Sequence, residues 1–378
     1  MSRLFSARQL LLPLVPAYRL ALLLRELRLR LGLEPLRSLR HPVVSIGNLS
    51  TGGSGKTPLT IALAKALKQR GCVVDVLSRG YGRRSKHAAC VRPDGRAEEF
   101  GDEPLLIARR SGVPVYVGRQ RFEAGQMAEG ELVGQGFSPD ASAAQTAWAL
   151  APEVGFSEDL PLNGSSPKIQ KTPILNSLTA VHLLDDGFQH RQLHREVNIL
   201  LLDKRDWQDS LLPAGNLREP LHAARRATII AIPAGEPALE AALRAWGWQG
   251  PIWRLQRTME VPAVEGPVAA FCGIARPEQF FEGLEAGGLK LCAHIAFPDH
   301  HRFTVADLKR LTATARAAEA TALITTEKDL VRLGQIAQAL PESLPLLTAG
   351  LHIEIENEDE VLGWLLGRLA VGPARPPL

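Results

Sequence analysis

The residues best suited to chemistry form one short loop, Ser50-Thr51-Gly52-Gly53-Ser54-Gly55-Lys56-Thr57. It matches the pattern G-x-x-x-x-G-K-[ST], except that Ser50 stands in the place of the first glycine. In such a loop the small residues allow backbone N–H groups to wrap the β- and γ-phosphates of a nucleotide. The lysine adds a positive charge, and the hydroxyl after it is a ligand for Mg²⁺. The loop therefore predicts binding of a nucleoside triphosphate as its magnesium complex.

Two adjacent carboxylates, Asp185 and Asp186, follow the apolar run Ala180-Val-His-Leu-Leu184. An apolar run of this length predicts a strand of a parallel sheet, and ligands of open α/β sheets bind beyond the carboxyl ends of the strands. An aspartate at that edge can hold the metal ion, or its water shell, opposite a phosphate-binding loop. The pair is therefore a candidate for contact with Mg²⁺, and the alternative is a solvated turn.

Two further groups are ambiguous from the residues alone. Asp102-Glu103-Pro104 opens an apolar stretch, where acidic residues often cap the first turn of a helix. His300 and His301 lie in Phe297-Pro-Asp-His-His301, a pattern common in surface loops, and no other ligand group has the spacing of a metal site. Spacing alone favours capping for Asp102 and gives no metal site at the histidines.

A strand and a helix must flank the loop at 50–57 for it to bind phosphate. Residues 41–47 predict a short buried strand, and 58–67 predict the helix that follows. Short, continuous apolar strands that alternate with helices form parallel sheets covered on both faces. The predicted fold class is α/β, a P-loop NTPase-type parallel sheet with helices on both faces. Its further strands are expected at 72–77, 113–117, 180–184, 197–202 and 228–232.

The length of 378 residues predicts two domains, because single cores seldom grow beyond about 250 to 300 residues. The larger domain is expected over 41–250. Its segment 126–177 lacks arginine and is dominated by Gly, Ser, Ala and Pro, which predicts a mobile insertion, either an active-site lid or a tolerated loop. A second, smaller α/β domain is expected over 251–372, followed by a tail over 373–378. Its predicted elements are strands at 268–272 and 322–325 and a helix over 305–318.

The net charge of +4 is modest and gathers at the amino terminus. Residues 1–40 contain eight arginines and two glutamates, so the rest of the chain is slightly acidic, and no nucleic-acid partner is expected. The four cysteines lie far apart without C-x-x-C pairs. This spacing suits a reducing cytosol and gives neither a disulfide framework nor a zinc site.

The leucine-rich residues 10–33 are interrupted by Pro13, Pro16 and several arginines before the ~20 apolar residues needed to cross a bilayer are reached. A secretory signal is not expected either, because the apolar stretch is short and no small-residue cleavage site follows. From Tyr18 onward, leucines alternate with arginines in a pattern that gives a helix one apolar and one basic side. Such a helix suits the surface of an anionic membrane, and equally a helix that packs on the first domain.

Taken in order, these segments resemble the tetraacyldisaccharide 4'-kinase family of the lipid A pathway. The resemblance covers most of the chain apart from the insertion and the tail, and Asp-Asp-Gly-Phe-Gln-His at 185–190 is its most distinctive string. Two departures concern loop geometry, because the insertion looks longer than the family's connection and Asn216 stands where the family usually has proline. The matching motifs are Val44-Ser-Ile-Gly-Asn-Leu-Ser-Thr-Gly-Gly-Ser-Gly-Lys-Thr-Pro58, Ser78-Arg-Gly-Tyr-Gly82, Gly101-Asp-Glu-Pro104, Leu184-Asp-Asp-Gly-Phe-Gln-His190, Leu211-Leu-Pro-Ala-Gly-Asn-Leu-Arg-Glu-Pro220, Phe271-Cys-Gly-Ile-Ala-Arg-Pro277, Phe297-Pro-Asp-His-His301 and Thr325-Thr-Glu-Lys-Asp329.

The resemblance implies roles for residues that spacing alone leaves open. Asp102 is similar to the family's general base, His300 to the histidine that polarises it, and Arg79 lies in the family's loop near the reacting groups. Asp186 is implied in catalysis beside the phosphates. The implied metal ligands are Thr57, Asp185 and Glu219.

The same resemblance implies an ATP- and Mg²⁺-dependent kinase that transfers the γ-phosphoryl group to the 4'-hydroxyl of tetraacyldisaccharide 1-phosphate. The lipid disaccharide is then the substrate, and residues 1–40 contact an anionic membrane, at the cytoplasmic face of the bacterial inner membrane. Two other functions agree with the motifs, a P-loop kinase of a soluble small molecule and a membrane-recruited NTPase switch. The switch proteins of the partition type carry an additional early lysine in their loop, which residues 50–54 lack.

Overall fold

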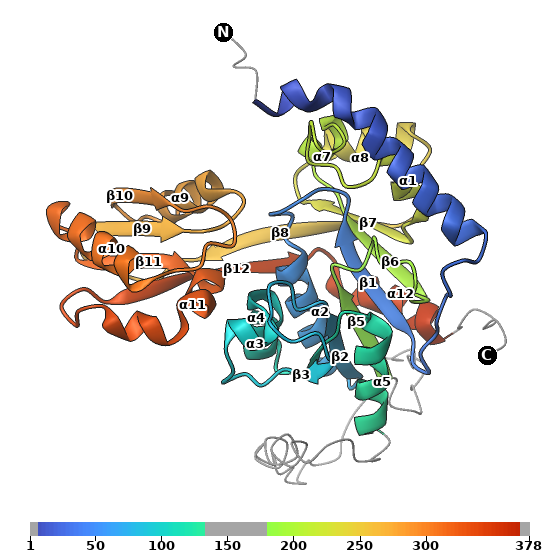
Figure 1. The fold of residues 1–378 in the computed structure, drawn as a ribbon, viewed down its shortest axis with the longest axis horizontal. Helices are drawn as coiled ribbons and strands as arrows, with labels where there is room; N and C mark the ends of the chain where they lie inside the picture. Colours follow the sequence, from blue (N-terminus) through green and yellow to red (C-terminus); the bar gives the residue numbers. More distant parts are fainter. Residues whose placement is uncertain (1–6, 133–179, 371–378) are drawn as a thin grey trace, which may run out of the picture.

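A computed structural model describes residues 7–132 and 180–370, and its strands form one sheet that runs through two lobes (Figure 1). We call the part around β1 the first lobe and the part around β9 the second lobe. The sheet has 12 strands in the order β10-β9-β11-β12-β8-β7-β6-β1-β5-β2-β4-β3. The mostly parallel sheet with flanking helices confirms the predicted α/β class.

The first lobe is built on parallel strands that are buried on both faces. Its strands are β1 (Val43–Asn48), β2 (Val73–Ser78), β4 (Val115–Val117), β5 (Ala180–Asp185), β6 (Val197–Leu201) and β7 (Ile229–Pro233), with β3 (Ala89–Cys90) antiparallel at the edge. One core holds side chains of α2 (Lys56–Gln69), α4 (Asp102–Ser111) and α12 (Glu358–Ala370) against the sheet. The short α3 (Ala97–Phe100) precedes α4. Separate cores hold α5 (Arg121–Leu132) and α8 (Pro237–Ala245), and α7 (Lys204–Gln208) follows β6.

The second lobe repeats this layering on a smaller scale. Its parallel strands are β9 (Val268–Cys272), β10 (Leu291–Ala296) and β11 (Ala322–Thr326). Leucines of α10 (Val305–Ala317) pack in one core of this lobe, and Phe280 and Leu284 of α9 (Pro277–Ala286) pack in the other. The helix α11 (Glu327–Leu333) follows β11 directly and contacts α4 of the first lobe.

Two long strands, β8 (Ile252–Glu260) and β12 (Leu346–Ile355), join the lobes (Figure 1). β8 is parallel to β7 of the first lobe, and its later residues pair antiparallel with Gly350–Ile355 of β12. The earlier residues of β12, Leu346–Ala349, are parallel to β11 of the second lobe. The chain then returns to the first lobe, where Leu362, Leu365 and Leu369 of α12 pack against its core.

Most predicted strands are confirmed to within two residues, including β1, β2, β5, β9 and β11. The sequence analysis missed β8, β10 and β12, in which exposed or partly exposed residues interrupt the apolar run. Residues 126–132, predicted to belong to an insertion, continue the helix α5. The rest of that insertion and the predicted tail at 373–378 lie outside the described residues.

The amino-terminal segment forms a 3₁₀ helix, η1 (Ala7–Leu14), and the helix α1 (Val15–Arg30). Val15, Tyr18 and Leu22 of α1 pack beside the core that holds α8, so one side of the helix rests on the first lobe. On its other side Leu20, Leu23, Leu24 and Leu27 are 51% to 65% exposed. Among the described residues, no helix has the length and apolar character needed to cross a bilayer.

A buried ionic cluster lies at the amino ends of β2 and β5. The Nδ1 atom of His182 lies 2.8 and 2.9 Å from the two carboxylate oxygens of Asp75, and its Nε2 atom lies 3.5 Å from Glu129 on α5. Burial alone would lower the pKa of His182, but Asp75 and Glu129 outweigh it and raise this pKa to about 9. The cluster therefore holds a charged histidine at neutral pH and fastens α5 to the sheet.

We expect this cluster to make stability depend on pH in the alkaline range. The pKa of His182 is about 9 in the folded chain, against 6.5 for a histidine free in water. The stabilisation is therefore complete below pH 6.5 and is lost as the pH rises through 9. The shift corresponds to about 3 kcal/mol of unfolding free energy. Urea unfolding at pH 6.5 and 9.5 should show this loss in the wild type and a much smaller one in His182→Gln, and equal losses in both would contradict the assignment.

Candidate active site

The phosphate-binding loop, residues 50–57, joins the carboxyl end of β1 to the first turn of α2. Gly52, Gly53 and Gly55 have φ values of +73°, +62° and +89°, which side-chain-bearing residues rarely adopt. Gly55 caps α2, and no described side chain bonds to the N–H groups of its first turn, so these donors and the positive end of the helix dipole face the loop. The loop thus has the backbone arrangement that anion-binding sites at helix amino termini share.

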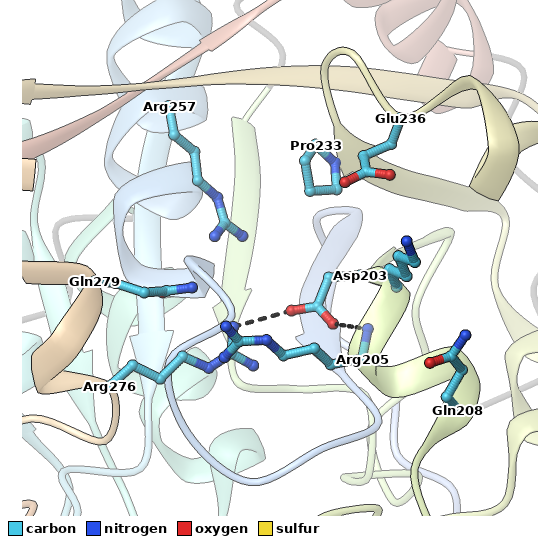
Figure 2. Close-up of a pocket in the computed structure, with 9 residues that line it drawn as sticks. Asp203, Arg205, Gln208, Pro233, Glu236, Arg257, Arg276 and Gln279 are labelled. Atoms are coloured by element: carbon cyan, nitrogen blue, oxygen red, sulfur yellow. Dashed lines mark hydrogen bonds and ion pairs between the residues drawn. The ribbon is translucent and has the colours of Figure 1, made fainter. Parts of the chain in front are cut away.

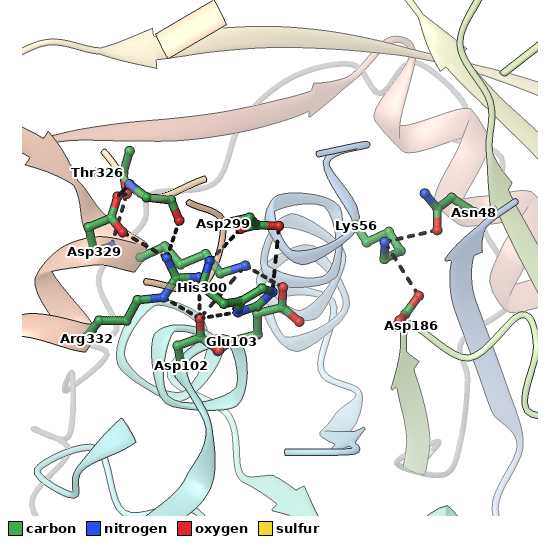
Figure 3. Close-up of polar contacts among 12 residues, drawn as sticks. Asn48, Lys56, Asp102, Glu103, Asp186, Asp299, His300, Thr326, Asp329 and Arg332 are labelled. Carbon is green, nitrogen blue, oxygen red and sulfur yellow. Dashed lines mark hydrogen bonds and ion pairs between the residues drawn. The ribbon is translucent and has the colours of Figure 1, made fainter. Parts of the chain in front are cut away.

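The positive charge of this loop is the ammonium group of Lys56, which the side chains of Asn48 and Asp186 contact. Lys56 Nζ donates to Asn48 Oδ1 at 3.0 Å and lies 3.5 Å from Asp186 Oδ1. Asn48 in turn donates to Ser50 Oγ at 3.2 Å, so a single amide orients both the lysine and the residue that replaces the first glycine. Figure 3 shows Lys56 between Asn48 and Asp186. The ammonium group is fixed where phosphate oxygens would lie.

A segment of the second lobe closes directly over the loop. A Cβ atom at Gly52 would lie 2.7 Å from the Cβ of Ala275, and one at Gly53 would lie 3.0 Å from Cδ of Arg276. Arg257 of β8 donates to the carbonyl oxygen of Ser54 at 2.5 Å. A side chain at Gly52 would collide with Ala275, so this approach of the two lobes requires glycine there.

The two aspartates at the end of β5 have different environments. Asp185 is 1% exposed, and Thr60 donates to it at 3.2 Å. Burial, with Glu103 and Asp186 nearby, raises the pKa of Asp185 to about 7. Burial would also raise the pKa of Asp186, but Lys56 and Arg218 outweigh it and lower this pKa to about 2. Asp186 is therefore a fixed anion between two cations, whereas Asp185 becomes a better anion only when a further cation arrives.

Asp102 is the first residue of α4, but the N-cap is Gly101 and no described side chain caps the helix, so the capping expected from spacing is wrong. The carboxylate of Asp102 points to the second lobe. Its Oδ2 atom lies 3.2 Å from Nδ1 of His300, and Arg332 and Lys328 of α11 also face it (Figure 3). Burial opposes ionisation, but Lys328 and Arg332, and His300 in its protonated form, hold the pKa of Asp102 well below its usual range. The structure thus brings together the predicted pair Asp102 and His300, and it selects His300 over His301, which pairs with Asp307.

The remaining predicted site residues, Arg79 and Glu219, form no hydrogen bond or ion pair with Asp102 or His300 in the described structure. Arg79 is exposed after β2, and the ring of Tyr81, two residues later, lies 5.5 Å from that of His300. Glu219 instead bonds to Arg226 and lies 3.7 Å from Arg25 of α1. Its neighbour Arg218 reaches Asp186 at 3.0 Å.

Backbone conformation also marks this region. Asp186 and His300 have φ values of +48° and +58°, a left-handed conformation that is uncommon for residues with side chains. Such conformations gather at functional sites, where the surrounding structure offsets their cost of about 1–3 kcal/mol. The same two residues are among those singled out from the sequence.

Sequence analysis missed four polar residues of the site, namely Asn48, Arg218, Lys328 and Arg332. Lys328 and Arg332 are four residues apart, so they share one face of α11 and were detectable only once that segment was known to be helical. Lys328 Nζ donates to Glu103 Oε1 at 2.8 Å and lies 3.9 Å from Asp102. Asn48 and Arg218 lie inside strings that resemble the family, but nothing in their spacing showed which groups they contact.

The residues around the loop fit a nucleotide with its magnesium ion. Among the described residues, no three His, Cys, Asp or Glu side chains are grouped as a metal site. Mg²⁺ in phosphate-transfer sites, however, binds to one or two protein oxygens together with substrate phosphates and water. Thr57 and Asp185 supply such oxygens. Ser54, a residue of the loop itself, has a buried Oγ atom without a hydrogen-bond partner among the described residues.

A cavity of about 410 Å³ lies beyond this loop, on the side of β6 and β7 (Figure 2). Asp203 holds Arg276 at 3.0 Å across it, and that arginine comes from the second lobe. Ligand sites for small molecules usually have about 300 to 1,000 Å³. Its walls are formed by Asp203, Lys204, Arg205, Gln208, Pro233, Glu236, Arg257, Arg276 and Gln279.

Known proteins match this chain over almost its whole length. The family model described as tetraacyldisaccharide-1-P 4'-kinase matches residues 7–370. A tetraacyldisaccharide 4'-kinase of Koribacter versatilis is 36% identical, with 86% of this chain and 88% of the relative covered. One of Dechloromonas aromatica is 35% identical, with 77% of this chain and 75% of the relative covered.

A solved structure agrees with these relatives. The crystal structure of "apo" form LpxK from Aquifex aeolicus in complex with ATP matches with a TM-score of 0.65 and 31% identity. The match covers 96% of this chain and 99% of that chain. This chain therefore belongs to the tetraacyldisaccharide-1-P 4'-kinase family.

Proposed function

We propose that this chain transfers the γ-phosphoryl group of ATP to the 4'-hydroxyl group of tetraacyldisaccharide 1-phosphate. The observation that carries the proposal is the meeting of the two lobes beside the phosphate-binding loop. There the carboxylate of Asp102 faces His300 of the second lobe at 3.2 Å, close to the loop that Ala275 covers. A kinase needs groups that bind the phosphates of the nucleotide and a group that accepts the proton of the substrate. Both must lie in one site that excludes water when it closes.

The first half of the proposed reaction is the binding of ATP. In this proposal residues Thr51 to Thr57 surround the phosphates and Lys56 offsets their charge. Arg79, which is exposed after β2, is assigned as a further cation. The cavity beside Arg276 receives the nucleoside. Thr57 and Asp185 would hold Mg²⁺, which supplies further charge compensation when bound. Glu219 joins this set only if it leaves Arg226, with which it pairs here.

The second half is the activation of the sugar hydroxyl group. A hydroxyl has a very high pKa, so a carboxylate that accepts its proton as the new bond forms assists the step. We assign this role to Asp102, whose lowered pKa keeps it unprotonated before the substrate arrives. His300 lies within reach of the proton that Asp102 takes up, and Asp186 keeps Lys56 in place.

The lipid substrate also requires a route to the site. Arg25 of α1 lies 3.7 Å from Glu219 and donates to the carbonyl oxygen of Gln189, which follows the aspartate pair. We propose that the exposed leucines of α1 enter an anionic membrane at the cytoplasmic face of the bacterial inner membrane. The inner side of α1 then places residues 185–190 next to the bilayer surface.

The exposed leucines should control membrane binding. Replacing Leu20, Leu23 and Leu27 together by glutamine is expected to lower partitioning into vesicles on the order of 1,000-fold, because each buried leucine contributes roughly 1.5 kcal/mol or more. Sedimentation with vesicles of anionic phospholipid measures the effect. Leu351→Gln, at a leucine of β12 that is 39% exposed, is the matched control and should bind as the wild type does. Unchanged partitioning of the triple variant would argue against membrane contact through α1.

The proposed activity is tested by following label from the γ-phosphate of ATP. The purified chain is incubated in detergent micelles with Mg²⁺ and tetraacyldisaccharide 1-phosphate, and a parallel reaction omits the lipid. Label in the lipid supports the proposal. Label released only as free phosphate would favour the NTPase switch. Equal phosphorylation of a detergent-free soluble sugar would favour a kinase of small molecules.

A further inference from the structure

Arg332 of α11 occupies the space between the two residues assigned to proton transfer. Its Nε and Nη2 atoms lie 2.7 and 2.6 Å from Oδ2 of Asp102, and Nη2 also lies 3.1 Å from Nδ1 of His300. The side chain is only 6% exposed. Figure 3 shows the guanidinium group reaching across from the second lobe to Asp102.

The third guanidinium nitrogen of Arg332, Nη1, anchors the side chain within the second lobe. Nη1 donates to the carbonyl oxygen of Gly273 at 2.5 Å and to Oδ1 of Asp329 at 2.9 Å. Asp329 is fully buried and is itself held by the hydroxyl of Thr326 and the N–H of Gly273. Since a guanidinium group is planar, these contacts also fix the direction in which Nε and Nη2 point.

We infer that Arg332 is a positioning residue, which holds the carboxylate of Asp102 and the ring of His300 as two adjacent, unprotonated acceptors until the substrate delivers its proton. This inference rests on the proposed function, in which Asp102 is the base. Arginine can only donate, so the approach of Nη2 to Nδ1 is a hydrogen bond when Nδ1 carries no proton, and we assign this tautomer to His300. The ring N–H then lies on Nε2, on the side of Asp299.

This arrangement has a consequence for the order of proton movements. While Arg332 donates to both groups, His300 does not donate to Asp102 through Nδ1. Once Asp102 has taken the proton of the sugar hydroxyl, its attraction to Arg332 weakens and its new O–H faces Nδ1 at 3.2 Å. The proton can then pass to His300, which restores the carboxylate.

Other charged groups facing Asp102 do not duplicate this role. Glu103 on α4 is engaged by Lys328, and Lys328 remains 3.9 Å from Asp102. Asp299 lies beyond the far side of the His300 ring, at 3.9 Å from Nε2, and Tyr81 packs against that ring. Arg332 is thus the cation in direct contact with both acceptors among the described residues.

The test compares Arg332→Gln, which removes the charge, with Arg332→Lys, which keeps it. We expect Arg332→Gln to lower kcat for lipid phosphorylation roughly 10- to 100-fold at pH 7.5, with KM for ATP changed less than about twofold. Without the cation the pKa of the buried Asp102 rises, so kcat of this variant should fall as the pH drops from 8 to 5, where the wild type changes little. Arg332→Lys should recover the flat profile. Arg316→Gln, at an exposed arginine of α10, is the control.

A second measurement does not depend on activity. ¹⁵N NMR of histidine-labelled protein should show Nδ1 of His300 unprotonated in the wild type at pH 7.5 and protonated in Arg332→Gln. A variant that stays folded but keeps the wild-type pH profile and the same His300 signals would overturn the inference. Loss of kcat without either change would also overturn it, because it would indicate a structural role alone. If the wild type labels no lipid, the proposed function fails, and the NMR result still decides the role of Arg332.

Discussion

Replacing Asp102 with asparagine is expected to lower kcat for lipid phosphorylation by roughly 10² to 10⁴-fold, the usual contribution of a general base. Asparagine has nearly the same shape and can still accept the bond that Oδ1 receives from the N–H of Glu103 at 3.0 Å. It carries no charge and cannot take up a proton at neutral pH. KM for ATP should change little, because Asp102 lies apart from the groups that contact Lys56. Initial rates of label transfer to lipid measure the effect.

The control for this substitution is Asp94→Asn, which changes an exposed aspartate. It should leave kcat and the melting temperature unchanged. Asp102→Asn itself is expected to lower the melting temperature, since Arg332 and Lys328 lose their anionic partner. If kcat stays within threefold of the wild type, Asp102 has a structural role alone.

Replacing Lys56 with methionine should abolish most phosphoryl transfer, with a loss of about 10² to 10³-fold in kcat. The ammonium group is the charge that Asn48 and Asp186 hold at the loop. Unlike Asp102→Asn, this variant should also weaken ATP binding, and it should slow ATP hydrolysis in the absence of lipid. Equilibrium binding of labelled ATP and single-turnover transfer separate the two effects.

Lys65→Met is the matched control, because Lys65 lies exposed on the same helix α2. It should bind ATP and transfer phosphate as the wild type does. A Lys56→Met variant with unchanged ATP affinity and rate would show that residues 50–57 are not the nucleotide site. In that case the fit of the loop to a magnesium nucleotide would be coincidental.

The sequence was sufficient where one local pattern decides the structure. Val43 to Gly47 is mostly apolar, is buried on both faces and leads into glycines with left-handed backbone, so the strand, loop and helix could be predicted directly. The sequence analysis missed β8 because no continuous apolar pattern marks this strand. Its buried residues, among them Trp253 and Leu255, alternate with exposed ones because it spans the junction of the lobes, and no long apolar run results.

Local sequence patterns also predict only part of the candidate site. Lys56 and the aspartate pair belong to strings whose chemistry is local, whereas the contact between Asp102 and Arg332 joins residues 230 positions apart. Only the folded chain, with α11 packed on α4, brings this arginine to the base. The resemblance to the family supplied Asp102 and His300 as a pair, which spacing alone did not. The placement of Glu219 beside Arg25 and Arg226 also depends on α1, and no local pattern predicts it.

The antiparallel pairing of β8 with β12 also bears on the modularity of the chain. Glu260 and Gly350 are opposite one another in that ladder, so the second lobe enters and leaves at neighbouring points, as a module inserted into a hairpin. A short turn that joined these two residues would restore the hairpin and leave α12 on its own core. Such a shortened chain would keep Lys56 and the aspartate pair but lose His300 and Arg332. The phosphate-binding loop and Asp102 therefore lie on one module, and the groups that face Asp102 lie on another, which the sheet accommodates without interrupting its strand order.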